Sequence, residues 1–134
     1  REGRSGLLLL SFGTMLATAK LVAAKLDATL VNMRFVKPLD QALLLQLTAR
    51  HRAVATLEEN VVSGGAGSAV SELLALAGVS VSLLNIGIPD RFIEHGSRDD
   101  CLRSAKLDLS SVSSTIERWW AGQSNPGARA AAAS

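Results

Sequence analysis

Hydrophobic residues along the chain alternate between two patterns. Short continuous apolar runs are typical of strands that are covered on both faces of a parallel sheet. Four such runs occur, at residues 7–12, 28–33, 53–57 and 79–86. Between them, apolar residues recur at helical spacing, and we expect one amphipathic helix after each of the first three runs. The order βαβαβαβ, followed by helices, predicts an α/β fold: a three-layer, doubly wound, mainly parallel sheet with right-handed crossovers.

The expected helices have recognisable starting points. Asp40 is a good N-cap for the second helix, and Thr14 is placed to cap the first. A short helix is expected at 98–106, and a last helix is expected to be capped by Asp108 or Ser110. The predicted buried faces consist of Met15, Ala19, Val22 and Leu26 in the first helix, Leu43, Leu44 and Leu47 in the second, Ala69, Val70, Leu73, Leu74 and Ala77 in the third, and Val112, Ile116 and Trp119 in the last.

The simplest strand order for this pattern is 2-1-3-4, and its switch point lies between the first and third strands. Open α/β sheets bind ligands there, outside the carboxyl ends of the strands. The residues that face this crevice are expected to be 11–14, ending in Thr14, and the acidic sequence Glu58-Glu59-Asn60. Because Glu58 and Glu59 are adjacent on an extended chain, they point to opposite sides and cannot form one acid/base pair without a bulge. We expect a structural hydrogen-bonding role for at least one of them.

A glycine-rich loop at 64–68, which begins with Gly64 and Gly65, opens the third helix. Helix N-termini bind anions through free backbone N–H groups, so one hypothesis is a phosphate cradle. The loop lacks the Lys-Ser/Thr sequence of a P-loop and the GxGxxG spacing of a dinucleotide site. The alternative is a tight turn whose small residues let the helix pack on the sheet, and we favour this alternative.

Other candidate side chains lie near the C-terminus. The loop after the fourth strand contains His95, a candidate functional side chain for which we favour the alternative of a role in loop structure or an interface. In the same loop, Asp90 and Arg91 are expected to form a local ion pair. Cys101 has no histidine near it in a catalytic motif, so we interpret it as a buried or bystander thiol. The tandem Trp119-Trp120 cannot both face one core, and we expect one ring to be buried and the other exposed.

Composition narrows the function classes. The chain has 134 residues, of which 48% are hydrophobic and 19% charged, as in an ordinary globular domain. A net charge of +2 without a long basic cluster gives no support for binding to nucleic acid or anionic membranes. No apolar run approaches the length of a membrane span, and no secretory signal is evident. One cysteine excludes an internal disulfide, argues against a zinc site and fits a reducing compartment, so we expect a cytoplasmic protein.

Several longer motifs resemble a known family. They match, in order and spacing, the C-terminal domain of 1-deoxy-D-xylulose-5-phosphate synthase, a transketolase-like enzyme that depends on thiamin diphosphate. The match covers most of residues 5–120, and VNMRFVKPLD and NIGIPDRFI are specific to this synthase rather than to transketolases generally. The matching segments are LLLLSFGT (7–14), ATLVNMRFVKPLD (28–40), TLEEN (56–60), GGAGSAVSE (64–72) and LNIGIPDRFIEHG (84–96).

The resemblance implies a role within a larger enzyme. The family's homodimeric enzyme condenses pyruvate with D-glyceraldehyde 3-phosphate, using thiamin diphosphate and magnesium that its first two domains hold. No Gly-Asp-Gly motif of the cofactor site occurs in this sequence, so we assign no catalytic, cofactor-binding or metal-binding residue. The implied partners are the upstream domains and the second subunit. The candidate interface or crevice residues are Thr14, Glu58, Glu59, Asn60, Gly64, Gly65, Asp90, Arg91 and His95.

The resemblance, together with turn residues and low-complexity alanine near the C-terminus, gives the expected domain limits. Residues 1–121 are expected to form the domain, and 122–134 a disordered tail. The family's fold has an additional antiparallel edge strand, which we expect to be truncated here, leaving an exposed edge that favours association.

We therefore interpret the chain as a fragment that is folded but inactive alone. The alternative function is a stand-alone α/β module that binds a small ligand or anion at the switch-point crevice. A phosphoacceptor receiver domain is disfavoured because the third strand ends in glutamates and no acidic pair follows the first strand.

Overall fold

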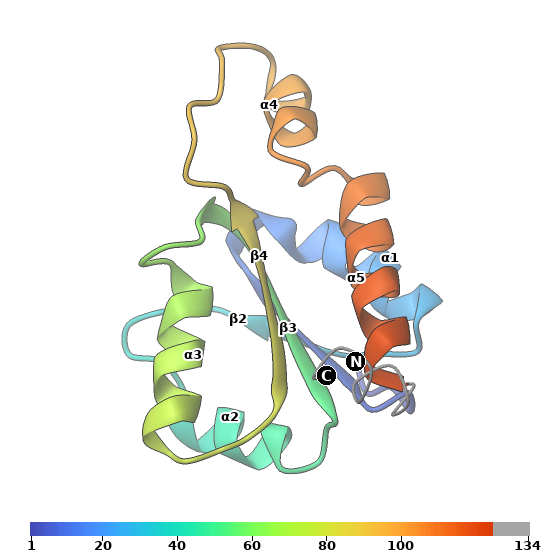
Figure 1. Ribbon diagram of the computed structural model, residues 1–134, viewed down its shortest axis with the longest axis vertical. Coiled ribbons are helices and arrows are strands. Elements are labelled where there is room, and N and C mark those ends of the chain that lie inside the picture. The colour runs from blue at the N-terminus through green and yellow to red at the C-terminus, as the bar shows by residue number, and fades with distance from the viewer. Residues whose placement is uncertain (125–134) are drawn as a thin grey trace, which may run out of the picture.

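Four parallel strands form the centre of the molecule in the order β2-β1-β3-β4 (Figure 1). The computed structural model describes residues 1–124. Every residue of β1 is buried, as expected for a central strand covered on both faces. The predicted α/β class and strand order are therefore confirmed. The strands are β1 (Leu7–Phe12), β2 (Thr29–Met33), β3 (Ala53–Val61) and β4 (Ser82–Ile88).

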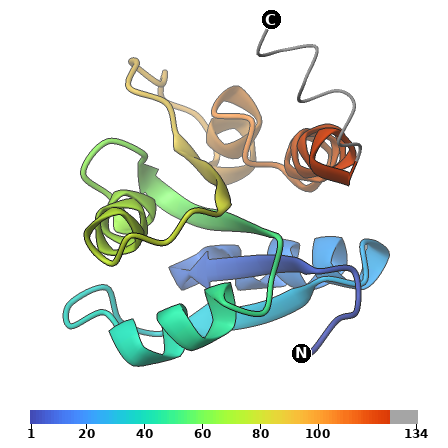
Figure 2. The same ribbon diagram turned by 60° about the horizontal axis from the view of Figure 1, so that its bottom comes forward.

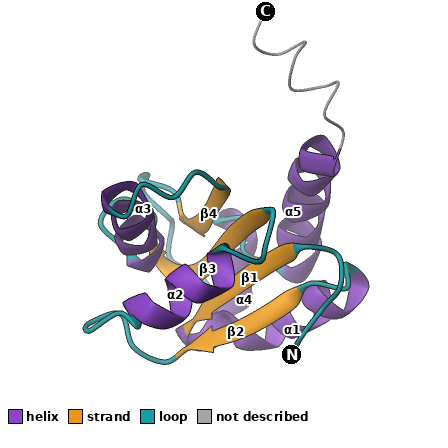
Figure 3. Cartoon of the chain, turned by 90° about the horizontal axis from the view of Figure 1, so that it is seen from below, coloured by secondary structure: helices purple, strands orange, loops and turns teal. Residues whose placement is uncertain are grey.

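Helices cover both faces of this sheet (Figures 2 and 3). Side chains of successive β1 residues alternate between the two faces, so Leu7 and Leu9 join one buried cluster and Leu8 and Leu10 the other. The first cluster includes residues of α1 and α5, and the second includes residues of α2 and α3. The helices are η1 (Gly13–Met15, a 3₁₀ turn), α1 (Leu16–Lys25), α2 (Gln41–Thr48), α3 (Ala66–Leu76), α4 (Arg98–Ser104) and α5 (Leu109–Ser124).

The predicted buried faces of the helices are largely confirmed. The fully buried residues among those predicted are Met15, Ala19, Val22, Leu44, Leu47, Val70, Leu74, Val112 and Ile116. Ala77 is exposed, and its assignment to the buried face is wrong. The physical reason is that α3 ends at Leu76, after which Gly78 turns the chain with a φ of +67°.

Both tryptophans of the tandem pair are half-buried, so the expectation of one buried and one exposed ring is wrong. Both rings pack against the cluster beneath α1 and α5. Consecutive helical positions are about 100° apart, which lets both meet a wide apolar face. The Arg52 guanidinium lies 4.9 Å from the Trp120 ring centroid and covers that ring with a cation–π contact.

Three of the helices are capped at their N-termini by a side chain. The Asp40 carboxylate accepts a hydrogen bond from the backbone N–H of the third residue of α2 at 3.1 Å, as predicted. Asp108, rather than Ser110, caps α5, and Ser97 caps α4. Thr14 does not cap α1, because its hydroxyl is directed to Glu59 instead. The last helix continues to Ser124, and the remainder of the expected tail, 125–134, lies outside the described residues.

The two edges of the sheet differ. Beside β2, Arg1 and Leu30 exchange both backbone hydrogen bonds, at 2.9 and 3.2 Å, which is the geometry of an antiparallel pair. Beside β4, no further strand lies among the described residues. No helix within residues 1–124 combines the length and apolarity needed to cross a bilayer.

Candidate functional site

The candidate site lies where β3 leaves the sheet and turns into α3; we call residues 58–68 the β3–α3 corner. β3 is longer than predicted and continues through Glu58, Glu59 and Asn60 to Val61. Its register with β4 shifts between Leu57 and Val61, so four residue steps of β3 lie beside two steps of β4. This irregularity places the acidic sequence on a bulged strand rather than in a loop.

Glu58 is completely buried beneath the start of α3. Its two carboxylate oxygens accept hydrogen bonds from the backbone N–H groups of Ala66 at 2.8 Å and Gly67 at 2.9 Å. These donors belong to the first turn of α3, where helical N–H groups have no partner within the helix. The carboxylate also lies at the positive end of the helix dipole. Glu58 therefore caps α3 from the preceding strand, which confirms the expected structural role for one glutamate.

The same hydrogen bonds argue against an anion cradle at the glycine-rich loop. The N–H of Gly64 donates to the Ser68 hydroxyl at 3.1 Å, and the N–H of Gly65 donates to the Val62 carbonyl at 3.3 Å. Together with the two N–H groups that Glu58 accepts, every backbone donor from 64 to 67 has an acceptor within the chain. A bound anion would have to displace a buried carboxylate, so the geometry supports the tight-turn interpretation.

Close packing explains the small residues of this loop. A Cβ atom on Gly65 would lie 2.6 and 2.7 Å from the two Glu58 carboxylate oxygens. One on Gly67 would lie 2.6 Å from Thr56 Oγ1 and 2.8 Å from Asn85 Oδ1. These distances are shorter than van der Waals contact, so the approach of α3 to the sheet requires glycine at both positions.

A chain of polar side chains continues behind the corner. Thr56 Oγ1 donates to Asn85 Oδ1 at 2.7 Å, and Asn85 Nδ2 donates to Ser71 Oγ at 2.9 Å. The Ser71 hydroxyl in turn donates to the Gly67 carbonyl at 2.9 Å. This network joins β3, β4 and α3, and the sequence analysis did not identify it. The sequence feature that indicates this network is the presence of two polar residues, Thr56 and Asn85, inside otherwise apolar strand segments.

Glu59 points to the opposite side of β3, as the spacing predicted. Its Oε2 accepts a hydrogen bond from the Thr14 hydroxyl and another from Arg98 Nη2 at 2.8 Å. The Thr14 hydrogen bond lowers the pKa of Glu59 most, and the Arg98 hydrogen bond and charge lower it further, against an opposing effect of partial burial. Glu59 thus connects η1, the turn after β1, to the first residue of α4. Arg98 is a member of this cluster that sequence reasoning missed.

Among the described residues, the remaining candidates take no part in the hydrogen bonds of Glu58 and Glu59. Asn60 is exposed, and its carbonyl lies against Gly87, where a Cβ would come within 2.6 Å. Asp90 forms no ion pair among residues 1–124 and is exposed, while Arg91 donates to the Ser104 carbonyl. The prediction of an ion pair between Asp90 and Arg91 is therefore wrong, because the Arg91 side chain binds the carbonyl at the end of α4 instead.

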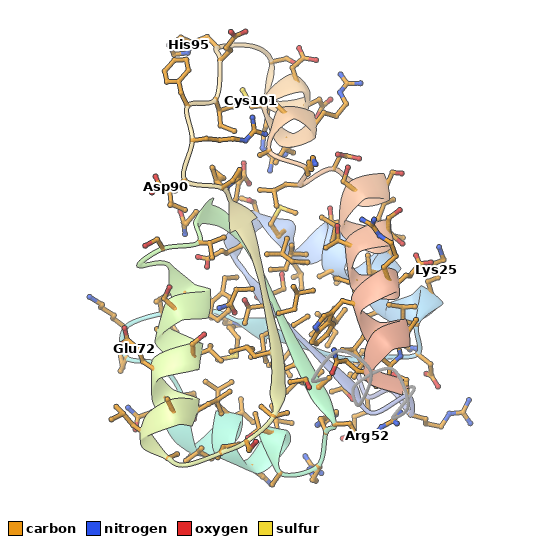
Figure 4. All side chains as sticks on the ribbon, in the orientation of Figure 1. Lys25, Arg52, Glu72, Asp90, His95 and Cys101 are labelled. Atoms are coloured by element: carbon orange, nitrogen blue, oxygen red, sulfur yellow. The ribbon has the colours of Figure 1, made fainter. Side chains whose placement is uncertain are left out.

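His95 lies on residues 89–106, which we call the α4 arm and which extends beyond the carboxyl end of β4 (Figure 4). The side chain of His95 is exposed at the far end of this arm. Cys101 is half-buried on the arm, with its sulfur 3.8 Å from the carbonyl oxygens of Glu94 and Gly96. These contacts are those of a thiol packed beneath a loop.

The corner offers little for acid/base chemistry. Glu58 is enclosed and its oxygens are engaged by two backbone N–H groups, while Glu59 is shared between a hydroxyl and a guanidinium. Among the described residues, no group of three histidine, cysteine or acidic side chains is arranged to hold a metal ion. The arrangement is one that holds β1, β3, α3 and α4 together.

Comparison with known proteins adds an independent result. The model of the family "Transketolase, C-terminal domain" matches residues 1–112. Two similar curated proteins are named 1-deoxy-D-xylulose-5-phosphate synthase. The one from Thioalkalivibrio sulfidiphilus is 53% identical over 116 residues, 87% of this chain and 18% of the relative. The one from Nitrosococcus oceani is 50% identical over 119 residues, 89% of this chain and 18% of the relative. The chain thus spans about a fifth of the length of these relatives.

A solved structure is similar as well. It is described as a split gene transketolase, inactive beta4 tetramer, and is 29% identical to this chain with a TM-score of 0.79. The superposition covers 88% of this chain and 40% of the other.

Proposed function

Because this chain belongs to the transketolase C-terminal domain family, we propose that it is the C-terminal domain of a 1-deoxy-D-xylulose-5-phosphate synthase. The observation that carries the proposal is 50–53% identity to proteins of that name over 87–89% of the chain. The motifs that are specific to this synthase, VNMRFVKPLD and NIGIPDRFI, fall within the matched residues. The complete enzyme would condense pyruvate with D-glyceraldehyde 3-phosphate, release carbon dioxide and form 1-deoxy-D-xylulose 5-phosphate in the cytoplasm.

The residues of the β3–α3 corner do not fit thiamin diphosphate or its magnesium ion. A diphosphate needs free backbone N–H groups or cations, whereas the N–H groups of Ala66 and Gly67 are bonded to Glu58. The buried carboxylate would also repel a second anion. In this proposal the cofactor and metal are held by other parts of the enzyme, and this domain is inactive alone.

We assign this domain a role in packing against the upstream domains and the second subunit of a homodimer. Three large apolar side chains are exposed just at or beyond the carboxyl ends of three strands: Phe35 (69% exposed) after β2, Val61 (42%) at the end of β3 and Phe92 (82%) after β4. Carboxyl ends of parallel strands lie at the same end of a sheet, so Phe35 and Val61 lie at that end and Phe92 lies on the α4 arm that extends from it. Exposed apolar side chains gathered at one end of a domain are typical of an interface.

A domain exchange tests the proposal. The corresponding C-terminal segment of the Thioalkalivibrio sulfidiphilus synthase is replaced by residues 1–124 of this chain, and formation of 1-deoxy-D-xylulose 5-phosphate is measured. We expect activity within about tenfold of that parent enzyme. The matched control carries Leu8→Asp in the grafted domain, which should abolish folding and activity. A grafted enzyme that is folded and dimeric but inactive would contradict the proposal.

The inactivity of the isolated domain is tested separately. We expect calorimetric titration of the 134-residue chain with thiamin diphosphate and magnesium to show no saturable heat. Micromolar binding would overturn the assignment of the cofactor site to other parts of the enzyme.

A further inference from the structure

Within the described part of the chain, the outer edge of β4 is not paired with another strand. The carbonyl of Ile88 accepts a hydrogen bond from Val62, so Ile88 directs its backbone groups toward β3. Because the N–H and C=O of one residue point to the same side and successive residues alternate, Leu83, Asn85 and Gly87 direct theirs away from β3. The register shift lies on β3, so this alternation is continuous along β4. Within residues 1–124 these outward groups make no hydrogen bond beyond the sheet.

A groove of about 590 Å³ follows this edge. Its walls include four consecutive β4 residues, 84–87, and on the other side Ala105 and Thr115. Side chains of consecutive strand residues point to opposite faces of the sheet. A groove that is lined by residues of both faces therefore runs along the edge of the strand. Figure 1 shows β4 at the end of the sheet, with the junction of α4 and α5 beyond its carboxyl end. Among residues 1–124, the groove therefore combines an unpaired strand edge with the apolar side chains of Leu84, Ile86 and Ala105.

The charges of this groove have one sign. Among the residues that the structure describes, Arg91 and Lys106 line the groove and no acidic side chain does. Arg91 donates one bond to the Ser104 carbonyl, which leaves its other N–H groups for a ligand. Asp90 adjoins Arg91 in sequence but does not line the groove.

We propose that the outer edge of β4 binds an extended acidic segment of another protein by strand addition. Leu83, Asn85 and Gly87 supply the backbone hydrogen bonds, and Leu84 and Ile86 contact apolar residues of the added strand. A carboxylate of that strand pairs with Arg91 and Lys106. Strand addition gives affinity through main-chain bonds and specificity through the alternate side chains.

A second copy of this chain fits the groove less well. Residues 82–88 contain no charged side chain, so two β4 edges paired with each other would bring no carboxylate to Arg91 or Lys106. At the other edge of the sheet, β2 is already paired at Leu30 with Arg1. The proposal does not depend on the activity of the parent enzyme.

The test uses the complete chain, labelled with ¹⁵N, and an acetylated synthetic peptide of alternating threonine and valine with two glutamates at one end. We expect the amide protons of Leu83, Asn85 and Gly87 to gain at least tenfold protection from hydrogen exchange at saturating peptide. Those of Leu84 and Ile86, already bonded to β3, should change much less. A peptide with lysines in place of the glutamates should bind at least tenfold more weakly.

Two further arms address the charges and the backbone bonds. Lys106→Glu should weaken binding of the glutamate peptide at least fivefold, whereas Lys20→Glu, the same charge change on α1, should not. N-methylation of alternate peptide amides should abolish binding while leaving the protein unaltered.

The proposal is overturned if the N-methylated peptide binds equally well, or if the glutamate and lysine peptides bind alike. It is also overturned if the three outward amides become protected with rising protein concentration and no peptide, because the occupant would then be a second copy.

Discussion

Replacing Glu58 should destabilise the fold more than replacing any other carboxylate of the corner. In Glu58→Gln, one amide oxygen can still accept a hydrogen bond, but the amide NH₂ meets the second backbone N–H, donor against donor. A hydrogen bond to a charged acceptor contributes about 1.5–3 kcal/mol, and a buried donor left without a partner costs about 1–3 kcal/mol. We therefore expect Glu58→Gln to lower the free energy of unfolding by about 3 kcal/mol. Glu58→Ala, which leaves the N–H groups of Ala66 and Gly67 unpaired, should lower it by about 4 kcal/mol.

The assay is urea unfolding followed by circular dichroism and by the fluorescence of the two tryptophans, both on α5. Coincident transitions would establish a two-state process and allow the free energies to be compared. The matched control is Glu59→Gln, one residue away on the same strand. Its carboxylate is partly exposed and bonded to side chains, so we expect a change of at most about 1 kcal/mol. If Glu58→Gln and Glu59→Gln had equal effects, or if Glu58→Gln stayed within about 0.5 kcal/mol of the parent chain, the assignment of Glu58 as the cap of α3 would be refuted.

Three other predictions follow from the same contacts. Gly65→Ala places a Cβ 2.6 Å from a Glu58 oxygen and 2.5 Å from the Val61 carbonyl oxygen, and should lower the free energy of unfolding by about 2 kcal/mol or more. The part of this loss that comes from Glu58 should disappear in the Glu58→Ala background, and an additive double mutant would contradict the clash with the Glu58 carboxylate. Because the folded-state pKa of Glu59 lies below its unfolded-state value, its contribution to stability is present at neutral pH and is lost as the pH falls through the folded-state pKa. Arg98→Gln should therefore make the unfolding free energy less dependent on pH in the acidic range, and an unchanged pH profile would show that the ion pair has no such role. Asp40→Ala removes the cap of α2, so we expect the free energy of unfolding to fall by about 1 kcal/mol and the melting temperature to fall with it. An unchanged melting temperature in calorimetry would mean that the cap is dispensable.

The caps and the helix ends show how far local sequence patterns can be used. Asp40 and Asp108 cap helices as their positions indicate, because an N-cap acts on backbone groups three residues away. Thr14 has the same residue type in a similar position, yet its hydroxyl binds Glu59, 45 residues further along the chain. Nothing near Thr14 in the sequence indicates that partner.

The interpretation of the glycine-rich loop depended on the tertiary structure in the same way. The sequence left open whether its N–H groups are free for an anion or are used internally. The answer is a carboxylate eight to nine residues earlier, on a strand whose bulge turns Glu58 under the helix. Without the bulge and the position of α3, either glutamate was an equal candidate for that role.

The sequence by itself determined the strand order, the two-sided burial of β1, the alternation of helices and strands, and the family. The strand order, the burial and the alternation depend on hydrophobic periodicity, which the local sequence encodes directly, whereas the family is indicated by longer motifs such as VNMRFVKPLD. Only the tertiary structure decided that Glu58 caps α3. It also decided that Glu59 joins Thr14 to Arg98, which follows Glu59 by 39 residues. It also showed that His95 is exposed at the far end of the α4 arm, and that within residues 1–124 the outer edge of β4 is unpaired and lies beside two cations. These features arise where distant segments meet, and their hydrogen bonds and charges are set by the packing of the whole sheet.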